Sequence, residues 1–461
     1  DLISYQGVEP CSVLAITFTN KAAQEMKDRL ALLVGPLVNE MWVMTFHAAC
    51  VRILRQDIEA LGYKRDFGIY DTQDQLQVIK DVLKQLDLDE KKFTPRYLNQ
   101  VISRFKSELK TPQKAEYTAR GYMEEVAAKV YERYQELLRN NNSLDFDDLI
   151  MLTVRLFQEH PQILEKYRQR FRYILVDEYQ DTNHAQYMFV RLLALKEKNI
   201  CVVGDDDQSI YGFRQADIRN ILDFERDYPE AKVVKLEENY RSSKKILAAA
   251  NAVISYNKDR KKKQLWTQNP EGEKLIHYQA FDEKDEARFV AEEINKLVME
   301  KGESYADCAV LIRTNAQSRA LEEWFIRARI PYRIVGGTRF YDRKEIKDIL
   351  AYLKFLSNPS DSVSLLRIIN VPRRGIGEAT AQKLIDYARE HSLAVGDVFA
   401  EIDQLPLGPK AVKDLTAFGG LMDKFRSMLG QATITELTET ILRDTGYMNE
   451  LLAENSYESQ S

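Results

Sequence analysis

The chain is poor in cysteine and has no long apolar run, and each absence excludes a class of protein. Its 461 residues include only four cysteines, Cys11, Cys50, Cys201 and Cys308, which lie far apart and form no CxxC pair. This spacing argues against a zinc site and for a reducing compartment. No stretch of about 18 apolar residues occurs, so we expect neither a membrane span nor a membrane partner.

The sequence also lacks an excess of positive charge. The formal net charge is -5, and 30% of the residues are charged, with mixed sign. Any nucleic-acid site must therefore be a local groove and not the whole surface. There is no secretory leader, which predicts a cytoplasmic protein. The chain starts at Asp1 and its tail completes no unit, so we interpret it as an internal piece of a longer protein.

Short β-rich runs alternate with helical stretches in the first half of the chain. We predict strands at residues 13–18, 42–46, 173–177, 200–205 and 233–236. Alternation of this kind indicates a mostly parallel sheet with helices on both faces. Residues 57–142 are helix-rich with no clear strand, which indicates a helical insertion.

A second alternation of strands and helices starts near Lys274. We predict strands at residues 274–281, 308–314 and 332–337, and helices at 285–299 and 317–329. After about Tyr341 the sequence is helical to its end. The chain thus has two α/β parts, each with additional helical sequence.

The stretch ILVDEYQDTN, residues 174–183, is the most informative of the chain. An apolar run that ends in two carboxylates, Asp177 and Glu178, is typical of a buried parallel strand at its carboxyl end, where open α/β sheets bind ligands. One carboxylate there can hold Mg²⁺ through water, and the other can orient or deprotonate an attacking water. The alternative is an acidic turn after a core strand.

The loop GDDDQSIYGFRQAD, residues 204–217, follows the next strand. An amide beside carboxylates, here Gln208, suits contact with a γ-phosphate and its attacking water. Tyr211 and Phe213 beside Arg214 suit stacking on unpaired bases. The alternative is that both aromatics are core residues of a following helix.

Three further loops carry weaker signals. TFTNKAA (17–23) and TFH (45–47) place hydroxyl and amide groups at helix N-termini, which bind phosphates or simply cap the helix. In ENYRSS (238–243), Arg241 could act on a transferring phosphoryl group and Tyr240 could stack on a base; a capped helix start is the alternative.

Near the C-terminus, NVPRRGIGEATAQKL (370–384) has a Gly-Ile-Gly turn before a helix, and LPLGPKAVKDL (405–415) is a looser echo of it. Such turns expose backbone amides to a duplex phosphate, or they are ordinary helix-helix turns. We interpret the basic cluster at residues 258–263 as a solvated surface, and the alternative is a position near nucleic acid.

Together these segments resemble the UvrD/PcrA type of superfamily 1A DNA helicases, in order and over nearly the whole chain. TFTNKAA, TFH, VDEYQDTN, GDDDQSIYGFRQAD and ENYRSS are similar to motifs Ia, Ib, II, III and IV of that family; LDFDDL (144–149), LIRTNAQSR (311–319) and residues 330–348 also resemble family segments. The resemblance implies an α/β fold with two RecA-like parallel-sheet motor domains and helical insertions. It implies domain 1A at residues 1–56 and 144–243, 1B at 57–143, the first part of 2A at 244–340, and 2B at 341–461.

The resemblance also implies roles for single residues. Asp177 would hold Mg²⁺, Glu178 would be the general base, Gln208 and Arg241 would contact the γ-phosphate of ATP, and Tyr240 would stack on adenine. The implied DNA contacts are Thr17, Phe18, Thr19, Asn20, Thr45, His47, Tyr211, Phe213, Arg214, Arg313, Asn315 and, toward duplex, Gly375 and Gly377.

Two residues and two motifs depart from the family pattern. Phe213 stands where Trp is common, and Gln215 stands where Gly is common and is expected to crowd the loop. The phosphate-cradling loop is expected before Asp1 and motifs V and VI after Ser461, because no GxxxxGK[ST] occurs in the chain. These 461 residues alone are therefore expected to hydrolyse ATP negligibly.

The resemblance implies an ATP-dependent helicase that translocates 3′ to 5′ on single-stranded DNA and unwinds duplex, in repair or replication. The expected partners are single strands, junctions of single strand with duplex, and repair or replication proteins. Two alternatives stay open: a non-hydrolysing DNA-binding or scaffold protein on the same fold, and a subunit of a helicase-nuclease.

Overall fold

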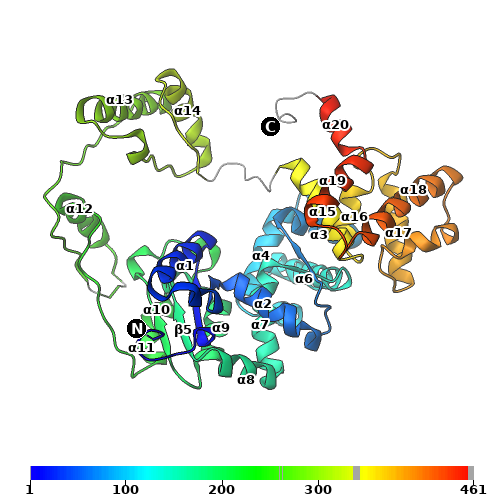
Figure 1. The fold of residues 1–461 in the computed structure, drawn as a ribbon, viewed down its shortest axis with the longest axis horizontal. Helices are drawn as coiled ribbons and strands as arrows, with labels where there is room; N and C mark the ends of the chain where they lie inside the picture. Colours follow the sequence, from blue (N-terminus) through cyan, green and yellow to red (C-terminus); the bar gives the residue numbers. More distant parts are fainter. Residues whose placement is uncertain (1, 259, 262, 336–342, 455–461) are drawn as a thin grey trace. The chain divides into compact units, whose positions relative to one another are not determined.

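The computed structural model describes residues 2–258, 260–261, 263–335 and 343–454, which form two compact units (Figure 1). Unit 1 comprises Asp1–Val234, Asn257–Lys262 and Asp348–Ser461; unit 2 comprises Lys235–Tyr256 and Lys263–Lys347. Each unit has a hydrophobic core of its own. Within the described residues, no helix is long and apolar enough to cross a bilayer.

A four-stranded parallel sheet with the order β2-β1-β5-β6 is the centre of unit 1. Its strands are β1 (Val13–Thr17), β2 (Trp42–Thr45), β5 (Tyr173–Val176) and β6 (Ile200–Val202). All five residues of β1 are buried, as the apolar run predicts for a central parallel strand. Ile16 pairs with Val176, and Thr17 pairs with Thr45, so the ends of these strands lie at one edge. The first four predicted strands are confirmed, each ending one to three residues early.

Helices pack on this sheet and begin where the sequence offers caps. The Thr19 side chain accepts a hydrogen bond from the backbone N–H of Ala22 (3.1 Å), and Thr45 accepts one from Ala48 (3.3 Å). The helices bury their apolar faces against the sheet, α1 in a small core with β1 and β2 and the others in the main core. They are α1 (Asn20–Val34), α2 (Phe46–Asp57), α7 (Phe146–Glu159), α8 (Pro161–Arg170), α9 (His184–Ala194), α10 (Arg219–Leu222) and α11 (Phe224–Asp227).

Residues 57–142 are helix-rich as predicted, but they also contain a strand, which pairs with another just after this range. The helices are α3 (Thr72–Gln85), α4 (Pro95–Ser107), α5 (Pro112–Thr118) and α6 (Tyr122–Asn140), around a separate core. Strand β3 (Gly68–Tyr70) pairs in parallel with β4 (Ser143–Asp145) at the base of the insertion. Three residues are too few for an alternating pattern, which explains why the prediction missed both strands.

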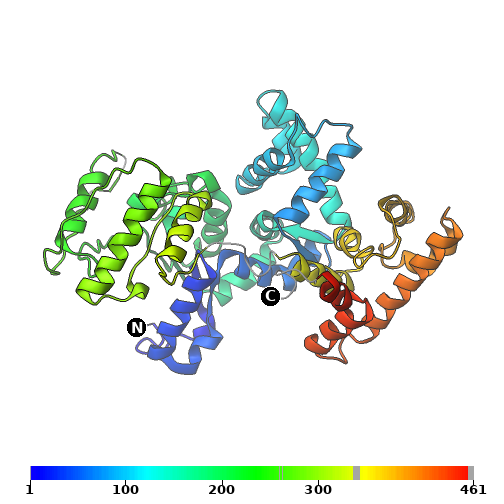
Figure 2. The same ribbon diagram turned by 90° about the horizontal axis from the view of Figure 1, so that it is seen from above.

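The C-terminal helices, the yellow-to-red segment of both views (Figures 1 and 2), have a separate core within unit 1. The helices are α15 (Lys344–Ser357), α16 (Ser362–Ile368), α17 (Glu378–Glu390), α18 (Pro409–Ser427), α19 (Ile434–Asp444) and α20 (Tyr447–Glu454). A buried hydrogen bond from Tyr70 Oη to Asp361 (2.8 Å) joins this lobe to the insertion. Asn358 adds a second link, because its side-chain amide donates to the carbonyls of Asn141 and Asn142.

Unit 2 contains the helices α12 (Lys244–Ile254), α13 (Glu283–Lys301) and α14 (Ser318–Arg327), and both helices predicted there after residue 274 are confirmed. The predicted strands at 274–281, 308–314 and 332–335 are wrong for this structure, because none of these described residues joins a ladder. The same holds for residues 233–236, where the chain passes from unit 1 to unit 2. Their apolar side chains are exposed, Leu311 by 95% and Phe281 completely. Residues 336 and 337 of the last predicted strand lie outside the described residues.

Short 3-10 turns complete the chain. They are η1 (Pro10–Ser12), η2 (Gly35–Glu40), η3 (Ile58–Leu61), η4 (Tyr179–Asp181), η5 (Asp206–Gln208), η6 (Gly212–Arg214), η7 (Tyr305–Asp307), η8 (Asn315–Gln317) and η10 (Val398–Gln404). Three of them, η4, η5 and η6, lie directly after β5 and β6 and shape the loops that the sequence singled out.

Candidate functional site

The acidic pair, Asp177 and Glu178, stands at the carboxyl end of β5. The Asp177 backbone N–H donates to the carbonyl of Ile16 (2.9 Å) and continues the sheet by one residue beyond the strand. Glu178 has a φ of 51°, a left-handed conformation that a non-glycine residue adopts rarely and usually where the surrounding structure imposes it. The chain therefore turns sharply, and the Glu178 side chain is exposed beside the half-buried Asp177.

Gln180 ties the acidic pair to the polar loop, residues 204–217. Its side-chain N–H donates to Glu178 Oε2 (2.8 Å), and its Oε1 accepts from the backbone N–H of Asp205 (3.0 Å). Gln180 is buried, so both amide ends need these partners. A Cβ on Gly204 would lie 2.5 Å from Gln180 Oε1, so the close approach requires glycine there. The two motifs thus form one connected site through Gln180, a role that the sequence analysis did not predict.

The polar loop begins with a tight acidic turn that presents Gln208. Asp205 accepts hydrogen bonds from the Asp207 backbone N–H and from the Gln208 side chain, both at 2.9 Å. The Gln208 side chain is exposed at the carboxyl edge of the sheet, where its predicted contact with a phosphate would require it.

Two described residues of the basic segment (257–262), Arg260 and Lys261, contact this turn. Arg260 forms an ion pair with Asp207, and the Lys261 backbone N–H donates to Asp206 Oδ2 (2.9 Å). Lys261 also pairs with Glu225. The interpretation of this cluster as a solvated surface is therefore wrong for Arg260 and Lys261, while Asp259 and Lys262 lie outside the described residues.

Aromatic rings gather at the ends of β1 and in the polar loop. Phe18 stacks on Tyr211 with ring centroids 5.4 Å apart, and Tyr211 lies 5.9 Å from Phe213. The Arg214 guanidinium is 5.3 Å from the Tyr211 ring and 5.7 Å from the Phe213 ring. Phe213 is 73% exposed, so it is not a core residue. The structure thus brings together four of the residues predicted to contact single-stranded DNA, and they come from two neighbouring loops.

A groove of about 720 Å³ opens beside these rings. One side is formed by Phe18, His47, Phe213 and Arg214, and the other by the insertion. The insertion contributes polar side chains of α4 that the sequence analysis missed: Asn99, Gln100, Ser103 and Ser107. Their spacing of three to four residues is the available signal, since it places them on one helix face.

Phe146 is a second residue that the sequence analysis passed over. Its ring meets His47 edge to face at 5.8 Å, and it is half exposed at the start of α7. Burial lowers the pKa of His47, which keeps its imidazole neutral near pH 7. His47 and Phe146 therefore offer a neutral, partly aromatic surface and not a cation.

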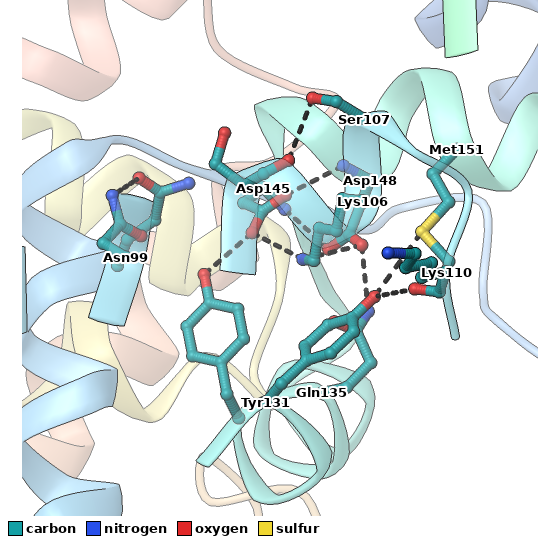
Figure 3. Close-up of polar contacts among 12 residues, drawn as sticks. Asn99, Lys106, Ser107, Lys110, Tyr131, Gln135, Asp145, Asp148 and Met151 are labelled. Atoms are coloured by element: carbon teal, nitrogen blue, oxygen red, sulfur yellow. Dashed lines mark hydrogen bonds and ion pairs between the residues drawn. The ribbon is translucent and has the colours of Figure 1, made fainter. Parts of the chain in front are cut away.

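A buried ion cluster fixes α4 as the groove wall (Figure 3). The fully buried Lys106 ammonium lies 2.6 Å from Asp145 Oδ2 and 2.8 Å from Asp148 Oδ1. Tyr134 donates to Asp145 (2.9 Å), and Gln135 donates to Asp148 (2.9 Å). Burial alone would lower the pKa of Lys106, but the two carboxylates outweigh it and raise that pKa. The cluster joins α4 and α6 to the start of α7.

Two carboxyl groups that face the groove are hard to ionise. Burial, with Glu178 nearby, raises the pKa of Asp181 to about 6. Burial and the charge of Asp145 raise the pKa of Asp147. One Asp181 oxygen, Oδ1, is buried with no hydrogen-bond partner, which agrees with a carboxyl group that protonates readily. The negative charge of this groove therefore decreases below about pH 6.

The other predicted groups at the β1 and β2 ends serve the helix starts. Thr17 is buried and donates to the Thr19 carbonyl (3.1 Å), and Thr19 and Thr45 cap α1 and α2. Asn20, the first residue of α1, is exposed. Capping is thus shown for both threonines, and their contact with DNA stays a prediction.

Four of the residues predicted to contact ATP or DNA lie in unit 2. Tyr240 is 79% exposed and donates to Glu238 Oε2 (2.8 Å), and Arg241 is exposed in a turn held by the Asn239 side chain. Arg313 and Asn315 are exposed around η8, where the Gln317 side chain accepts from the Arg313 backbone N–H. All four side chains are open to a ligand of unit 2.

The glycine turns of the C-terminal lobe lie next to each other. Gly375 has a φ of 78°, and a Cβ there would come within 3.4 Å of Asp414 on α18, whose N-terminus is the looser echo motif. Gly377 is the N-cap of α17 and has open space around it. Arg374 is turned inward and donates to the carbonyls of Ile368 and Val371. The Arg374 guanidinium is thus held within the lobe, while Arg373 and the backbone of both glycines are exposed.

Gln215 departs from the family pattern at a position where the backbone matters. Its φ of 67° is left-handed, a conformation that glycine adopts without strain. Its side-chain Oε1 is buried and has no hydrogen-bond partner. The expected crowding is therefore backbone strain together with an unsatisfied amide.

The donor set near Asp177 suits a metal ion only together with a ligand. Across the described residues, no group of three or more His, Cys, Asp or Glu side chains could hold a metal by itself. Mg²⁺ commonly binds through one or two carboxylates, waters and substrate phosphates, and this is what a single aspartate at a strand end provides.

These features define a RecA-like α/β protein with helical additions. The model of the UvrD/REP helicase N-terminal domain matches residues 1–229, and that of the UvrD-like helicase C-terminal domain matches residues 234–408. The chain belongs to the UvrD-like helicase family, of the UvrD/PcrA type.

Two curated relatives are similar to this chain over its whole length. It is 51% identical over 460 residues to the ATP-dependent DNA helicase PcrA of Bacillus subtilis (strain 168), covering 100% of this chain and 62% of that protein. It is also 51% identical over 460 residues to PcrA of Staphylococcus aureus (strain COL), covering 100% of this chain and 63% of that protein. The chain thus spans somewhat less than two thirds of these relatives.

Proposed function

We propose that the complete protein is an ATP-dependent DNA helicase that translocates 3′ to 5′ on single strands and unwinds duplex in DNA repair or replication. The observation that supports this most is the connection between two kinds of site. The acidic pair at the end of β5 and the aromatic groove at the end of the adjacent β1 share the polar loop through Gln180. The names of the relatives support the same activity.

The acidic pair supplies the hydrolytic chemistry in this proposal. Asp177 would hold Mg²⁺, which would neutralise charge on the ATP phosphates when bound. Glu178 is exposed and oriented by Gln180, so it can accept a proton from the attacking water. Gln208, one turn away, would contact the γ-phosphate, and Arg241 and Tyr240 of unit 2 would contact the γ-phosphate and stack on adenine.

The groove supplies the path of the strand. Phe18, Tyr211 and Phe213 would stack on bases, and Arg214 would add a cation beside them. His47, Arg313 and Asn315 would line the path, and the hydroxyl and amide groups of Thr17, Thr19, Asn20 and Thr45 would contact the backbone. Gly375 and Gly377 would offer backbone amides to duplex.

DNA-stimulated ATP hydrolysis and strand displacement by the complete protein test the proposal. We expect single strands to raise ATP turnover, and duplexes with a 3′ single-stranded tail to be unwound faster than those with a 5′ tail. Strand binding without turnover would favour the scaffold alternative. DNA cleavage by the same preparation would favour a helicase-nuclease. Preference for a 5′ tail would refute the proposed direction.

A further inference from the structure

The acidic turn of the polar loop has a cationic partner. Arg260 Nε lies 2.8 Å from Asp207 Oδ1 and 3.1 Å from Oδ2, and the guanidinium Nη2 also contacts Oδ2. The Arg260 side chain is only 15% exposed and the Asp207 side chain 8%. Such a forked and largely desolvated pair differs from a solvated surface pair, because removing one partner leaves the other charge uncompensated.

The turn needs this partner because of its own charge. Asp205, Asp206 and Asp207 are consecutive, and like charges this close repel one another. The basic segment compensates two of them, Asp207 through the Arg260 side chain and Asp206 through the Lys261 backbone N–H. The third, Asp205, is then able to hold the Gln208 side chain at 2.9 Å.

The basic segment also has an unusual place in the chain. Asn257–Lys262 belongs to unit 1, whereas the residues before and after it, Lys235–Tyr256 and Lys263–Lys347, belong to unit 2. Arg260 therefore belongs to a six-residue stretch of unit 1 that is flanked in the sequence by two segments of unit 2. At this point it contacts the residue next to Gln208.

We propose that Arg260 is a positioning residue that acts through Asp207. Its ion pair holds the turn in the shape that presents Gln208. Arg260 touches neither nucleotide nor strand in this role. The inference rests on the proposed function, since Gln208 has its task only in an ATPase that DNA stimulates.

Loss of Arg260 should change DNA-stimulated ATP turnover and leave basal ATP turnover unchanged. Arg260 lies outside the acidic pair and the aromatic groove, so its loss leaves Glu178, Tyr211 and Phe213 in place. If Gln208 is displaced, strand binding in the groove would no longer affect the contact between Gln208 and the γ-phosphate. We therefore expect the rate at saturating DNA to fall while basal rate and strand affinity are kept.

A double-mutant cycle in the complete protein tests this. The variants are Arg260→Gln, Asp207→Asn and the two together, with Lys258→Gln as a matched control at an exposed lysine of the same segment. Each single variant should reduce the ATPase rate at saturating oligo(dT) by about tenfold, a usual size for the loss of one coupling element. The double variant should be no slower than the slower single variant, because both remove one interaction. Lys258→Gln should match the wild type.

Basal ATPase, oligo(dT) affinity and melting temperature of the same samples decide between positioning and general structure. Arg260→Lys should recover part of the stimulation, because it keeps the charge but not the fork. Additive losses in the double variant, or basal and stimulated rates that fall together with the melting temperature, would overturn the proposal. So would an Arg260→Gln variant with wild-type stimulation. A wild-type protein without DNA-stimulated ATPase would refute the proposed function itself, and this inference with it.

Discussion

Units 1 and 2 contain similar strand-like sequences in different surroundings. In unit 1, β1 is paired on both sides, and all five of its residues are buried. In unit 2, residues 274–281 and 308–314 have comparable apolar content but join no ladder in the described part of the chain, and Phe281 is fully exposed. A pattern of apolar residues therefore indicates that a segment is able to form a strand, whereas the strand itself requires neighbouring backbone groups.

The comparison also separates the candidate chemistry. The acidic pair, the polar loop and the groove are all positioned by paired or capped elements of unit 1. The candidate groups of unit 2, Tyr240 and Arg241, stand on an exposed turn. Substitutions at the positioned residues of unit 1 should therefore have stronger effects than substitutions of the same residue types at exposed positions without a proposed role.

The strongest expected effect is at the end of β5. Glu178→Gln in the complete protein should keep nucleotide binding and reduce turnover by roughly 10²- to 10⁴-fold, because the amide keeps the shape but cannot accept the proton. Steady-state ATPase and nucleotide affinity measure both parts. Glu132→Gln, at an exposed carboxylate of α6, is the control and should change neither. Turnover within a few-fold of wild type would show that Glu178 is not the base.

A buried and a surface lysine give the next contrast. Lys106→Met should lower the free energy of unfolding by about 3–5 kcal/mol, because Asp145 and Asp148 lose the cation between them. Lys301→Met in unit 2 removes an exposed pair with Glu273 and should give no measurable change. Urea unfolding of both variants measures the difference. Equal effects would contradict the structural role of the buried cluster.

Substitution of exposed aromatic rings tests whether exposure alone is enough for contact with single-stranded DNA. Tyr211→Ala and Phe213→Ala should each weaken single-strand affinity by about 1–3 kcal/mol, if each ring stacks on one base. Phe281→Ala, at the fully exposed ring of unit 2, should leave it unchanged. Fluorescence titration with labelled oligonucleotide measures all three. A lowered melting temperature with normal affinity would instead place Tyr211 and Phe213 among structural residues.

The groove carboxyls predict a pH dependence. The pKa of Asp181 is raised to about 6, so strand affinity should increase severalfold as the pH falls through 6 and a charge that repels phosphates is lost. The same shift makes the contribution of Asp181 to stability greatest below its unfolded pKa and lost as the pH rises through about 6. Asp181→Asn should flatten the affinity profile. An unchanged profile in that variant would assign the dependence to another group.

Gln215→Gly gives the smallest expected effect. Relief of the left-handed backbone, roughly 1–2 kcal/mol, exceeds the loss from a more flexible unfolded chain, so the net stabilisation should be under about 1 kcal/mol. Thermal melting measures it. Gln431→Gly, at a glutamine outside the left-handed region, is the control and should be neutral or destabilising. Destabilisation by Gln215→Gly would show that the amide has an unrecognised partner.

The sequence predicted what depends on local pattern. It located the four strands of the sheet in unit 1, the caps at Thr19 and Thr45, the helix-rich residues 57–142 and the acidic pair. It failed where a feature depends on a partner remote in sequence. Arg260 was interpreted as solvated because its acidic partner lies 53 residues earlier. The unpaired segments of unit 2 were interpreted as strands for the same reason, since a pattern cannot show whether a neighbour is present.

One detail of the sheet sets how closely two events can be coupled. The backbone N–H of Asp177, the residue proposed to hold the metal, donates to the carbonyl of Ile16 in β1, and β1 ends one residue before Phe18. Neighbouring strands lie about 4.8 Å apart. No hinge or lever separates the two, and the connection is stiff in the direction of the hydrogen bonds. A displacement of Asp177 would therefore pass through one backbone hydrogen bond to Ile16, two residues before Phe18.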